Sequence, residues 1–509
     1  MNRQTNILEY LENIVHKCPD KTCYANELEQ LSFKEVYDSA RAVGTALAQM
    51  GLYKKPIVVF MRKHPKTIVA FLGVVYGGNY YVPIDEEMPS HRIEMIFERL
   101  QPEAIICDDS TRDAIRRFTY AGRVCDYDEL AKTSPDEAIL KQIADRAIDT
   151  DPVYVVFTSG STGVPKGVVA CHRSVIDYIE NLSDILRIDE NTIFGNQTPL
   201  YVDASLKEIY PTLKFGATAV IIPKELFMFP LKLVEFLNEK NINTICWVVP
   251  ALTLISGLGV FDKVIPKTLH TIAFGSEVFP MKQFLLWKKT LPNARFINLY
   301  GPTEATGMSC YYEVDREFTE KDVIPIGKPF KNKEILLLDE NNKEALKGEP
   351  GEICIRGTSL TMGYYRDFDK TGEVFVQNPL NDKYPELIYR TGDIGKYNEH
   401  GELVFLSRKD YQIKHMGHRI ELGEIEMVMN RMDGIVNSCC IFDDERKKII
   451  LCYMGSPSKA EVVQYAKGKL PRYMIPNLVD KLDTMPLTNN GKINRLLLKK
   501  KYIRKKESD

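Results

Sequence analysis

The stretch that decides the fold is Thr158–Gly167, TSGSTGVPKG, which directly follows the apolar run Val153–Phe157, VYVVF. This pattern predicts a buried strand that ends in a loop of glycines and hydroxyl side chains. Gly160 and Gly163 allow a close approach to the backbone, and Lys166 adds a positive charge. The loop therefore has the composition of a phosphate-binding site.

Two other interpretations of this loop fit less well. It does not match a Walker loop, because Pro165 and Gly167 stand where that motif requires Gly and then Ser or Thr. A flexible surface turn would explain the glycines but not the order of hydroxyls, proline and lysine.

Paired strand and helix patterns extend outward from the loop. Short β-branched runs occur at 56–60, 80–84, 217–222, 244–249, 270–274 and 295–299, and helical patterns at 67–76 and 174–186. They predict an α/β fold, with a large multi-layer N-terminal body that contains parallel-rich sheets. Hairpin signals at 339–342, 352–355 and 402–405 predict a small antiparallel region within that body.

A second, smaller domain is predicted at the C-terminal end. Residues 434–442 and 449–453 have strand patterns, and residues 460–470 have a helical one. We therefore expect a body over 1–407 and a small mobile α+β domain over 408–509.

The composition of the 509-residue chain excludes several classes of protein. Lys and Arg number 67 and Asp and Glu 69, a net charge of −2 that argues against nucleic acid as the main ligand. The uncharged stretch 68–84 contains Gly77 and Gly78 and is shorter than the ~20 residues of a membrane span. The N-terminus lacks the apolar centre of a secretory signal, and the 11 cysteines indicate no disulfide framework or zinc site, so we expect a cytoplasmic protein.

Further motifs, taken with the loop, resemble those of the adenylate-forming enzymes. This family includes acyl-CoA ligases, luciferases, adenylation domains of nonribosomal peptide synthetases and D-alanine:carrier-protein ligases. The resemblance covers nearly the whole chain and follows the family's order at 31–35 (LSFKE), 81–85 (YVPID), 298–304 (NLYGPTE), 351–353 (GEI), 389–393 (YRTGD), 408–426, 470–476 (LPRYMIP) and 490–492 (NGK).

The resemblance implies a ligase that works in two steps with ATP and Mg²⁺. A substrate carboxylate attacks the α-phosphorus of ATP, and the acyl-adenylate then passes to a thiol. The implied catalytic residues are Lys492, Thr303 and Glu304, of which Glu304 binds Mg²⁺. The implied ATP-binding residues are Thr158, Ser159, Gly160, Ser161, Thr162, Gly163 and Lys166 for the phosphates, Asn298 and Tyr300 for adenine, and Asp393 and Arg408 for the ribose.

The resemblance also suggests an amino acid as the substrate. Tyr201–Ser205, YVDAS, is similar to the motif whose aspartate pairs with the substrate's ammonium group, which assigns that role to Asp203. Capping of the following helix is the alternative role for Asp203. The pocket implied by alignment consists of Asp203, Ala204, Lys207, Trp247, Ile272, Phe274, Leu299, Gly307 and Met308.

The bulky members of that pocket favour a small amino acid such as alanine, and the segments 208–211 and 277–280 are similar to D-alanine:carrier-protein ligases. Lys207 leaves a second possibility open. If its side chain points inward, its charge suits an acidic substrate; if it points outward, it carries no information on specificity.

We expect the acceptor to be the phosphopantetheine thiol of a separate acyl or peptidyl carrier protein, because no carrier-like segment follows the small domain in this sequence. In this family the small domain swings between two poses, and Asp410 matches the pivot of a hinge near 409–410. We expect a monomer without a membrane span. The alternatives are an acyl-CoA ligase for a simple carboxylic acid and a non-catalytic nucleotide-binding relative.

Overall fold

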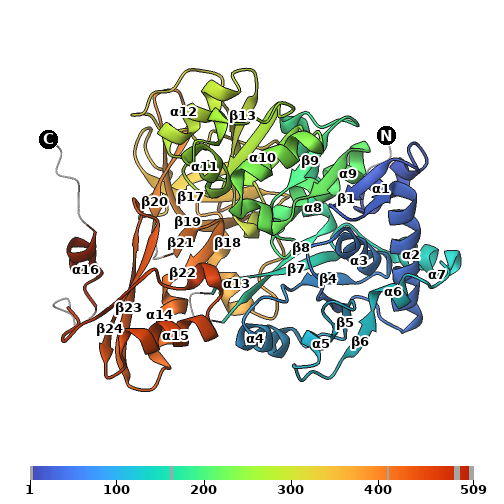
Figure 1. Ribbon diagram of the computed structural model, residues 1–509, viewed down its shortest axis with the longest axis horizontal. Coiled ribbons are helices and arrows are strands. Elements are labelled where there is room, and N and C mark those ends of the chain that lie inside the picture. Colours follow the sequence, from blue (N-terminus) through green and yellow to red (C-terminus); the bar gives the residue numbers. More distant parts are fainter. Residues whose placement is uncertain (1–3, 161–163, 410–411, 487–492, 504–509) are drawn as a thin grey trace. The chain divides into compact units, whose positions relative to one another are not determined.

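The computed structural model describes residues 4–160, 164–409, 412–486 and 493–503. The chain forms two compact units (Figure 1). Unit 1 comprises Met1–Glu86, Leu100–Phe157 and Gly167–Lys409, and unit 2 comprises Glu87–Arg99, Thr158–Lys166 and Asp410–Asp509. Across the described parts of the chain, no helix combines the length and apolarity that a membrane span requires.

Unit 1 contains a nine-stranded sheet in which six neighbouring strands, β1, β10, β9, β11, β12 and β13, run parallel. The spatial order is β15 (Lys328–Pro329), β14 (Cys310–Glu313), β13 (Arg295–Tyr300), β12 (Thr271–Gly275), β11 (Thr244–Val248), β9 (Ile193–Asn196), β10 (Thr218–Ile221), β1 (Thr22–Ala25) and β2 (Gln30–Ser32). The predicted strands at 217–222, 244–249, 270–274 and 295–299 are thereby confirmed.

A six-stranded sheet contains the strands on either side of the glycine-rich loop. Its order is β6 (Arg123–Asp126), β5 (Ala104–Cys107), β3 (Pro56–Val59), β4 (Tyr80–Pro83), β7 (Pro152–Thr158) and β8 (Lys166–Cys171). The pairs β6–β5, β5–β3, β3–β4 and β4–β7 are parallel. The prediction of buried parallel strands is confirmed, since every residue of β3, β4 and β5 is buried.

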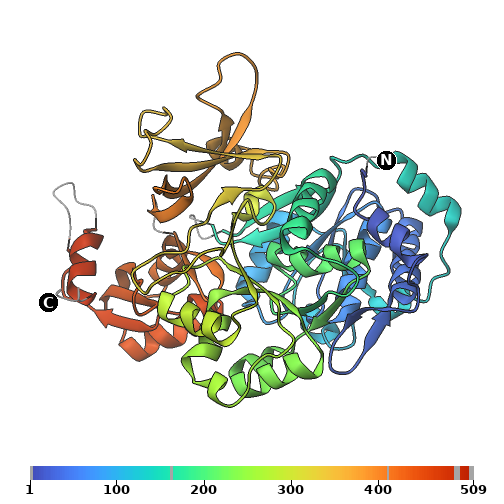
Figure 2. The ribbon, with the colours of Figure 1, turned by 90° about the horizontal axis from the view of Figure 1, so that it is seen from above.

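The predicted antiparallel region is also present. It forms a five-stranded sheet of β16 (Lys333–Leu338), β17 (Gly351–Gly357), β19 (Leu387–Tyr397), β18 (Phe375–Gln377) and β20 (Leu403–Arg408), drawn in gold to orange in Figure 2. The pairs β16–β17, β17–β19, β18–β19 and β19–β20 are antiparallel. The predicted end of the body, between 407 and 408, falls inside β20, the last strand of unit 1.

The helices of unit 1 are α1 (Glu9–Val15), α2 (Phe33–Gln49), α3 (Pro65–Tyr76), α5 (Arg112–Ile115), α6 (Tyr127–Leu130), α7 (Glu137–Arg146), α8 (His172–Leu186), α9 (Leu206–Phe215), α10 (Pro230–Glu239), α11 (Val249–Gly257), α12 (Met281–Thr290) and α13 (Phe368–Val374). Short 3₁₀ turns are η1 (Asp203–Ser205), η2 (Lys224–Met228), η3 (Val260–Asp262) and η4 (Thr303–Ala305). The start of α2 shows how the sequence sets a helix end. Ser32 and Glu35 form a reciprocal capping box, which satisfies two backbone donors.

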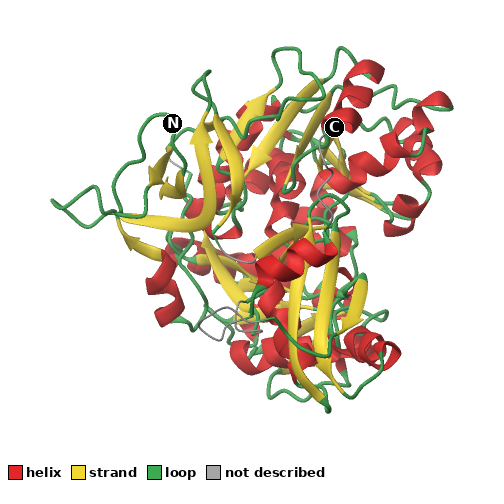
Figure 3. Cartoon of the chain, turned by 90° about the vertical axis from the view of Figure 1, so that its left-hand side faces the viewer, coloured by secondary structure: helices red, strands yellow, loops and turns green. Residues whose placement is uncertain are grey.

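Two cores lie on opposite faces of the nine-stranded sheet, because side chains alternate along a strand. Cys246, Ala273 and Ile297 belong to the first core, together with residues of α8 and α9. The neighbouring strand residues Trp247 and Phe274 belong to the second core, with residues of α10, α11 and α12. Figure 3 colours all helices red and all strands yellow. The sheet is therefore buried on both faces, as parallel sheets are.

Unit 2 has its own α+β core. It contains the hairpin β21 (Gln412–His415) and β22 (His418–Glu421), and the sheet β23 (Ile435–Asp443), β24 (Lys448–Gly455) and β25 (Leu478–Lys481). Its helices are α4 (Ser90–Leu100), α14 (Leu422–Asn430), α15 (Lys459–Lys469) and α16 (Arg495–Tyr502), with the 3₁₀ turn η5 (Arg472–Met474). The predicted strands at 434–442 and 449–453 and the helix at 460–470 are confirmed.

Candidate active site

The carboxyl end of β13 leads into the turn that carries two predicted catalytic residues. Thr303 and Glu304 begin the 3₁₀ turn η4, immediately after the predicted adenine contacts of β13. Gly307, three residues later, has a φ of +78°, and an added Cβ would lie 2.8 Å from the Tyr178 ring. Only glycine fits there without strain. Clefts outside the carboxyl ends of parallel strands are the usual ligand sites of such sheets.

Three predicted nucleotide-binding residues meet around one carboxylate. The Tyr300 hydroxyl donates to Asp393 Oδ2 at 2.5 Å, and the Arg408 guanidinium donates to Asp393 Oδ1. Asp393 and Arg408 are direct partners in the β19–β20 ladder, so the register fixes this pair. Burial and the adjacent Asp393 charge hold the pKa of Tyr300 well above its ordinary value, which keeps the hydroxyl protonated as a donor.

Two other predicted residues in unit 1 are buried beside polar groups. Asn298 Nδ2 donates to the Pro325 carbonyl at 2.8 Å, which orients the amide. Glu304 is 0% exposed, and its Oε1 accepts from the Tyr364 hydroxyl at 2.7 Å. Carboxylate oxygen is a hard donor of the kind that Mg²⁺ prefers, so Glu304 has the chemistry of a ligand for this ion.

The predicted phosphate-binding loop, 158–166, belongs to unit 2. Thr158 and Lys166 are the adjoining ends of β7 and β8, and Ser161, Thr162 and Gly163 lie outside the described residues. The Ser159 hydroxyl donates to the Arg419 carbonyl at 2.7 Å. An added Cβ at Gly160 would lie 2.0 Å from the Val164 carbonyl oxygen, so this position requires glycine. The Lys166 ammonium is buried and lies 4.0 Å from Glu421 Oε1.

Asp203 opens the helical segment η1–α9, and its carboxylate is surrounded by polar groups. A hydrogen bond with the Thr303 side chain and the charge of Lys207 favour its ionised form, but burial outweighs them and raises the pKa of Asp203. The hydroxyls of Tyr154 and Tyr178, which both sense the Asp203 charge, are buried without a hydrogen-bond partner among the described residues. This surplus of unsatisfied polar groups marks a site that a polar ligand would complete.

The remaining predicted pocket residues do not all lie on one face of the sheet. Leu299 and Met308 belong to the first core, on the side of α8 and α9. Trp247, Ile272 and Phe274 belong to the second core. Trp247 Nε1 donates to the Gly195 carbonyl at 2.7 Å, which ties that ring into the sheet. Ala204 lies in η1, next to Asp203.

Sequence reasoning did not assign a role to a buried polar cluster beside Lys207. Asn196 Nδ2 donates to Glu208 Oε2 at 3.2 Å, and burial raises the pKa of Glu208 to about 7. The Lys63 ammonium donates to the Asn196 and Gln197 carbonyls at 2.9 and 3.0 Å, and burial lowers its pKa to about 7. One signal was available: Glu208 lies between the apolar residues Leu206, Ile209 and Tyr210 of a buried helix.

Two predicted residues, the catalytic Lys492 and the hinge residue Asp410, lie outside the described residues. In the described portion of the chain, no cluster of three or more His, Cys, Asp or Glu side chains is arranged to hold a metal ion. A Mg²⁺ ion of the predicted kind needs no such cluster, because it is commonly held by one or two carboxylates and the phosphates of its substrate.

Comparison with protein families and curated proteins places these features in context. The family model described as "AMP-binding enzyme" matches residues 11–365. The chain is 32% identical over 499 residues to tyrocidine synthase 1 of Brevibacillus parabrevis, which covers 97% of this chain and 45% of that protein. It is 31% identical over 502 residues to gramicidin S synthase 1 of Brevibacillus brevis, with 97% and 44% covered. The chain thus spans less than half the length of these relatives.

Solved structures share the fold. One is holo-PA1221, described as a nonribosomal peptide synthetase protein containing adenylation and PCP domains, with a TM-score of 0.80 at 22% identity over 97% of this chain and 84% of that chain. Another is the amide bond synthetase McbA from Marinactinospora thermotolerans, with a TM-score of 0.84 at 16% identity over 98% of this chain and 100% of that chain. At these identities the likeness establishes the fold.

Proposed function

The chain belongs to the family of AMP-binding enzymes, and we propose that it activates an amino acid with ATP and transfers the aminoacyl group to the phosphopantetheine thiol of a separate carrier protein. The observation that carries the amino-acid assignment is the partly buried carboxylate of Asp203, which lies beside the buried hydroxyls of Tyr154 and Tyr178. Burial disfavours its charge, so a ligand that brings a cation stabilises the site. The α-ammonium group of an amino acid is such a cation, and a simple carboxylic acid has none.

In the first step, an oxygen of the substrate carboxylate forms a bond to the α-phosphorus of ATP. The bond from that phosphorus to the bridging oxygen breaks, and pyrophosphate leaves with the electron pair. The attack brings two anions together, so positive charge and orientation govern its rate. We assign the phosphates to the 158–166 loop and Thr303, adenine to Asn298 and Tyr300, and the ribose to Asp393 and Arg408. Lys492 stabilises the charge that develops during attack.

Glu304 is the residue that we assign to Mg²⁺. Its carboxylate is buried and its Oε1 accepts a 2.7 Å hydrogen bond from Tyr364, and carboxylate oxygen is the hard donor that this ion prefers. The residues present therefore fit a Mg²⁺ ion shared with the substrate's phosphates. When bound, the ion neutralises part of the triphosphate charge.

In the second step, the carrier's thiolate forms a bond to the carbonyl carbon of the aminoacyl-adenylate. The bond from that carbon to the phosphate oxygen breaks, and AMP leaves with the electron pair, while the thiol proton goes to solvent. The described adenylation and PCP domains of a structural neighbour support a carrier protein as the acceptor. The sequence-based size argument names a small amino acid such as alanine as one candidate, but Trp247 and Phe274 lie in one core and Met308 in the other, so the three do not line one wall.

The test is ATP–pyrophosphate exchange with the full chain across L- and D-amino acids, β-alanine and simple carboxylic acids. We expect exchange that depends on an amino acid, and at least a ~100-fold loss in Lys492→Ala, because that variant lacks a charge contact made in the transition state. Exchange with simple acids alone would instead identify an acyl-CoA ligase. No exchange with any acid, together with intact ATP binding, would identify a non-catalytic nucleotide-binding relative.

A further inference from the structure

Lys207, the second residue of α9, is a buried lysine, with only 4% of the residue exposed. Lysine side chains are rarely this buried unless a partner compensates their charge. Asp203 lies in the 3₁₀ turn η1 that precedes α9, four residues before Lys207. The two side chains are close enough that the charge of Lys207 favours the ionised form of Asp203.

Two other lysines of unit 1, the partly buried Lys63 and the buried Lys333, have hydrogen-bond acceptors. Lys63 donates to two backbone carbonyls, and Lys333 donates to the Met308 carbonyl at 2.7 Å. In contrast, no described residue accepts a hydrogen bond from Lys207 or forms an ion pair with it within 4.0 Å. An ammonium group in this position needs an anion that the described part of the chain does not supply.

Neither nearby carboxylate is a permanent partner for Lys207. Asp203 is the residue that we assign to the substrate's ammonium, so its charge is used when substrate binds. Glu208 accepts from Asn196, and its other oxygen, Oε1, has no partner among the described residues. Its pKa of about 7 means that it is only partly ionised at neutral pH. Binding of a neutral amino acid such as alanine would therefore leave the Lys207 charge without compensation.

We propose that the substrate is an acidic amino acid, whose side-chain carboxylate pairs with the Lys207 ammonium while its α-ammonium pairs with Asp203. This inference rests on the proposed amino-acid activation and specifies its substrate class. The two protein charges lie close enough to interact electrostatically. Such a pair suits aspartate or glutamate, whose ammonium and side-chain carboxylate are separated by only a few bonds. The α-carboxylate remains free to attack ATP.

The experiment measures kcat/KM for ATP–pyrophosphate exchange with the L- and D-forms of aspartate and glutamate, and with alanine. Asparagine and glutamine serve as controls matched in size. We expect the acids to exceed the amides by ~100-fold or more, because a site built for a charged group discriminates strongly against its neutral analogue. Lys207→Met should lower the acid values by at least ~100-fold and change the amide values by less than ~10-fold.

Two further variants separate charge from packing. Lys207→Arg keeps the charge and should retain more activity with acids than Lys207→Met. Lys214→Met makes the same change on the same helix, at a lysine that pairs with Glu180 at 2.5 Å, and should leave the preference between acid and amide unchanged. Aspartate or glutamate should raise the melting temperature of the wild type, with a non-hydrolysable ATP analogue present, and not that of Lys207→Met.

The outcomes distinguish the two levels of the proposal. Preference for the acids, lost in Lys207→Met, supports it. Exchange with alanine or the amides at rates equal to or above the acids overturns the acidic substrate but leaves amino-acid activation standing. Absence of exchange with every amino acid overturns both.

Discussion

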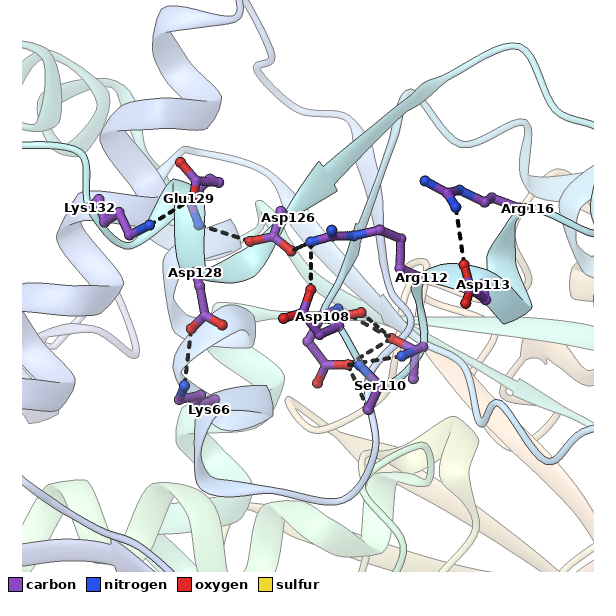
Figure 4. A network of polar contacts seen from close by, with 12 residues as sticks. Lys66, Asp108, Ser110, Arg112, Asp113, Arg116, Asp126, Asp128, Glu129 and Lys132 are labelled. Atoms are coloured by element: carbon purple, nitrogen blue, oxygen red, sulfur yellow. Dashed lines mark hydrogen bonds and ion pairs between the residues drawn. The ribbon is translucent and has the colours of Figure 1, made fainter.

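Two charged regions of unit 1 differ in how their charges are matched. The region around α5 and α6, shown in Figure 4, pairs its charges locally: Lys66 lies 3.0 Å from Asp128, Lys132 lies 2.7 Å from Glu129, and Arg112 contacts Asp126. The region at the start of α9 holds Asp203, which is partly buried, and Lys207 and Glu208, which are buried. Glu208 Oε1 has no hydrogen-bond partner among the described residues.

The difference follows from the surroundings of each region. An exposed ion pair gains little, because water solvates both charges well when they separate. A buried charge lacks that alternative, so an unmatched one persists only where function compensates for its cost. We therefore interpret the charges around α5 and α6 as ordinary solvent-exposed ion pairs. We interpret the charges at the start of α9 as part of a ligand site.

The largest effect is expected at Asp203. Asp203→Ala should lower amino-acid-dependent exchange by roughly 10³-fold, because removal of one member of a buried charge pair costs about 3–5 kcal/mol. ATP binding, measured by calorimetry, should be nearly unchanged, since no nucleotide contact is assigned to this side chain. Undiminished exchange would mean that another group holds the substrate's ammonium. The start of α9 would then not be distinguished from the α5 and α6 region by an unmatched charge that serves a ligand.

Much of the fold could be predicted from sequence because buried parallel strands are short, apolar and β-branched. The runs that became β3, β4 and β11 have this character, and their positions are right to within one residue at each end. The meeting of Tyr300, Asp393 and Arg408 could not be read from spacing, because it depends on the pairing of β19 with β20 and on a tertiary approach of β13. Motif order alone suggested that they share a site.

The side chains that line the predicted substrate pocket were harder to predict than the strands. Alignment assigns residues to positions along strands, but the face on which a side chain lies depends on the sheet's packing. Trp247 and Phe274 lie in the core formed with α10–α12, whereas Leu299 and Met308 lie in the other core. The sequence left open whether the Lys207 side chain points inward or outward. Lys207 is buried, and its charge acts on the buried thiol of Cys246, so the side chain points inward.

An intermediate effect is expected from Glu208, and it depends on pH. Burial raises the pKa of Glu208 from 4.5 to about 7, so the folded protein binds a proton more tightly than the unfolded chain does. Stability therefore falls as pH rises from about 4.5 to 7, and the full cost is present above that range. Glu208→Gln removes this titration and should be more stable than the wild type by about 3 kcal/mol at pH 8, with little difference near pH 4.5.

Urea unfolding at both pH values measures this difference. The charges of Lys63 and Lys207 both favour the ionised form of Glu208. If either cation moved closer, the pKa of Glu208 would fall and the pH range over which stability changes would become narrower. If the unfolding free energies of the wild type and Glu208→Gln changed in parallel with pH, nearby cations would already compensate the charge of Glu208. The charges at the start of α9 would then be matched like those around α5 and α6.

The smallest effect is expected in the paired region, and it completes the comparison. Lys132→Ala removes one cation from the network of Figure 4, where both Lys132 and Glu129 have about 70% of their side chains exposed. Water replaces the lost partner, so the melting temperature should change by no more than about 1 °C. The pH dependence and the amino-acid preference should stay as in the wild type. A loss comparable to that of Asp203→Ala would show that exposure does not decide which charges matter here, because a solvated pair would then be as costly to break as a buried one.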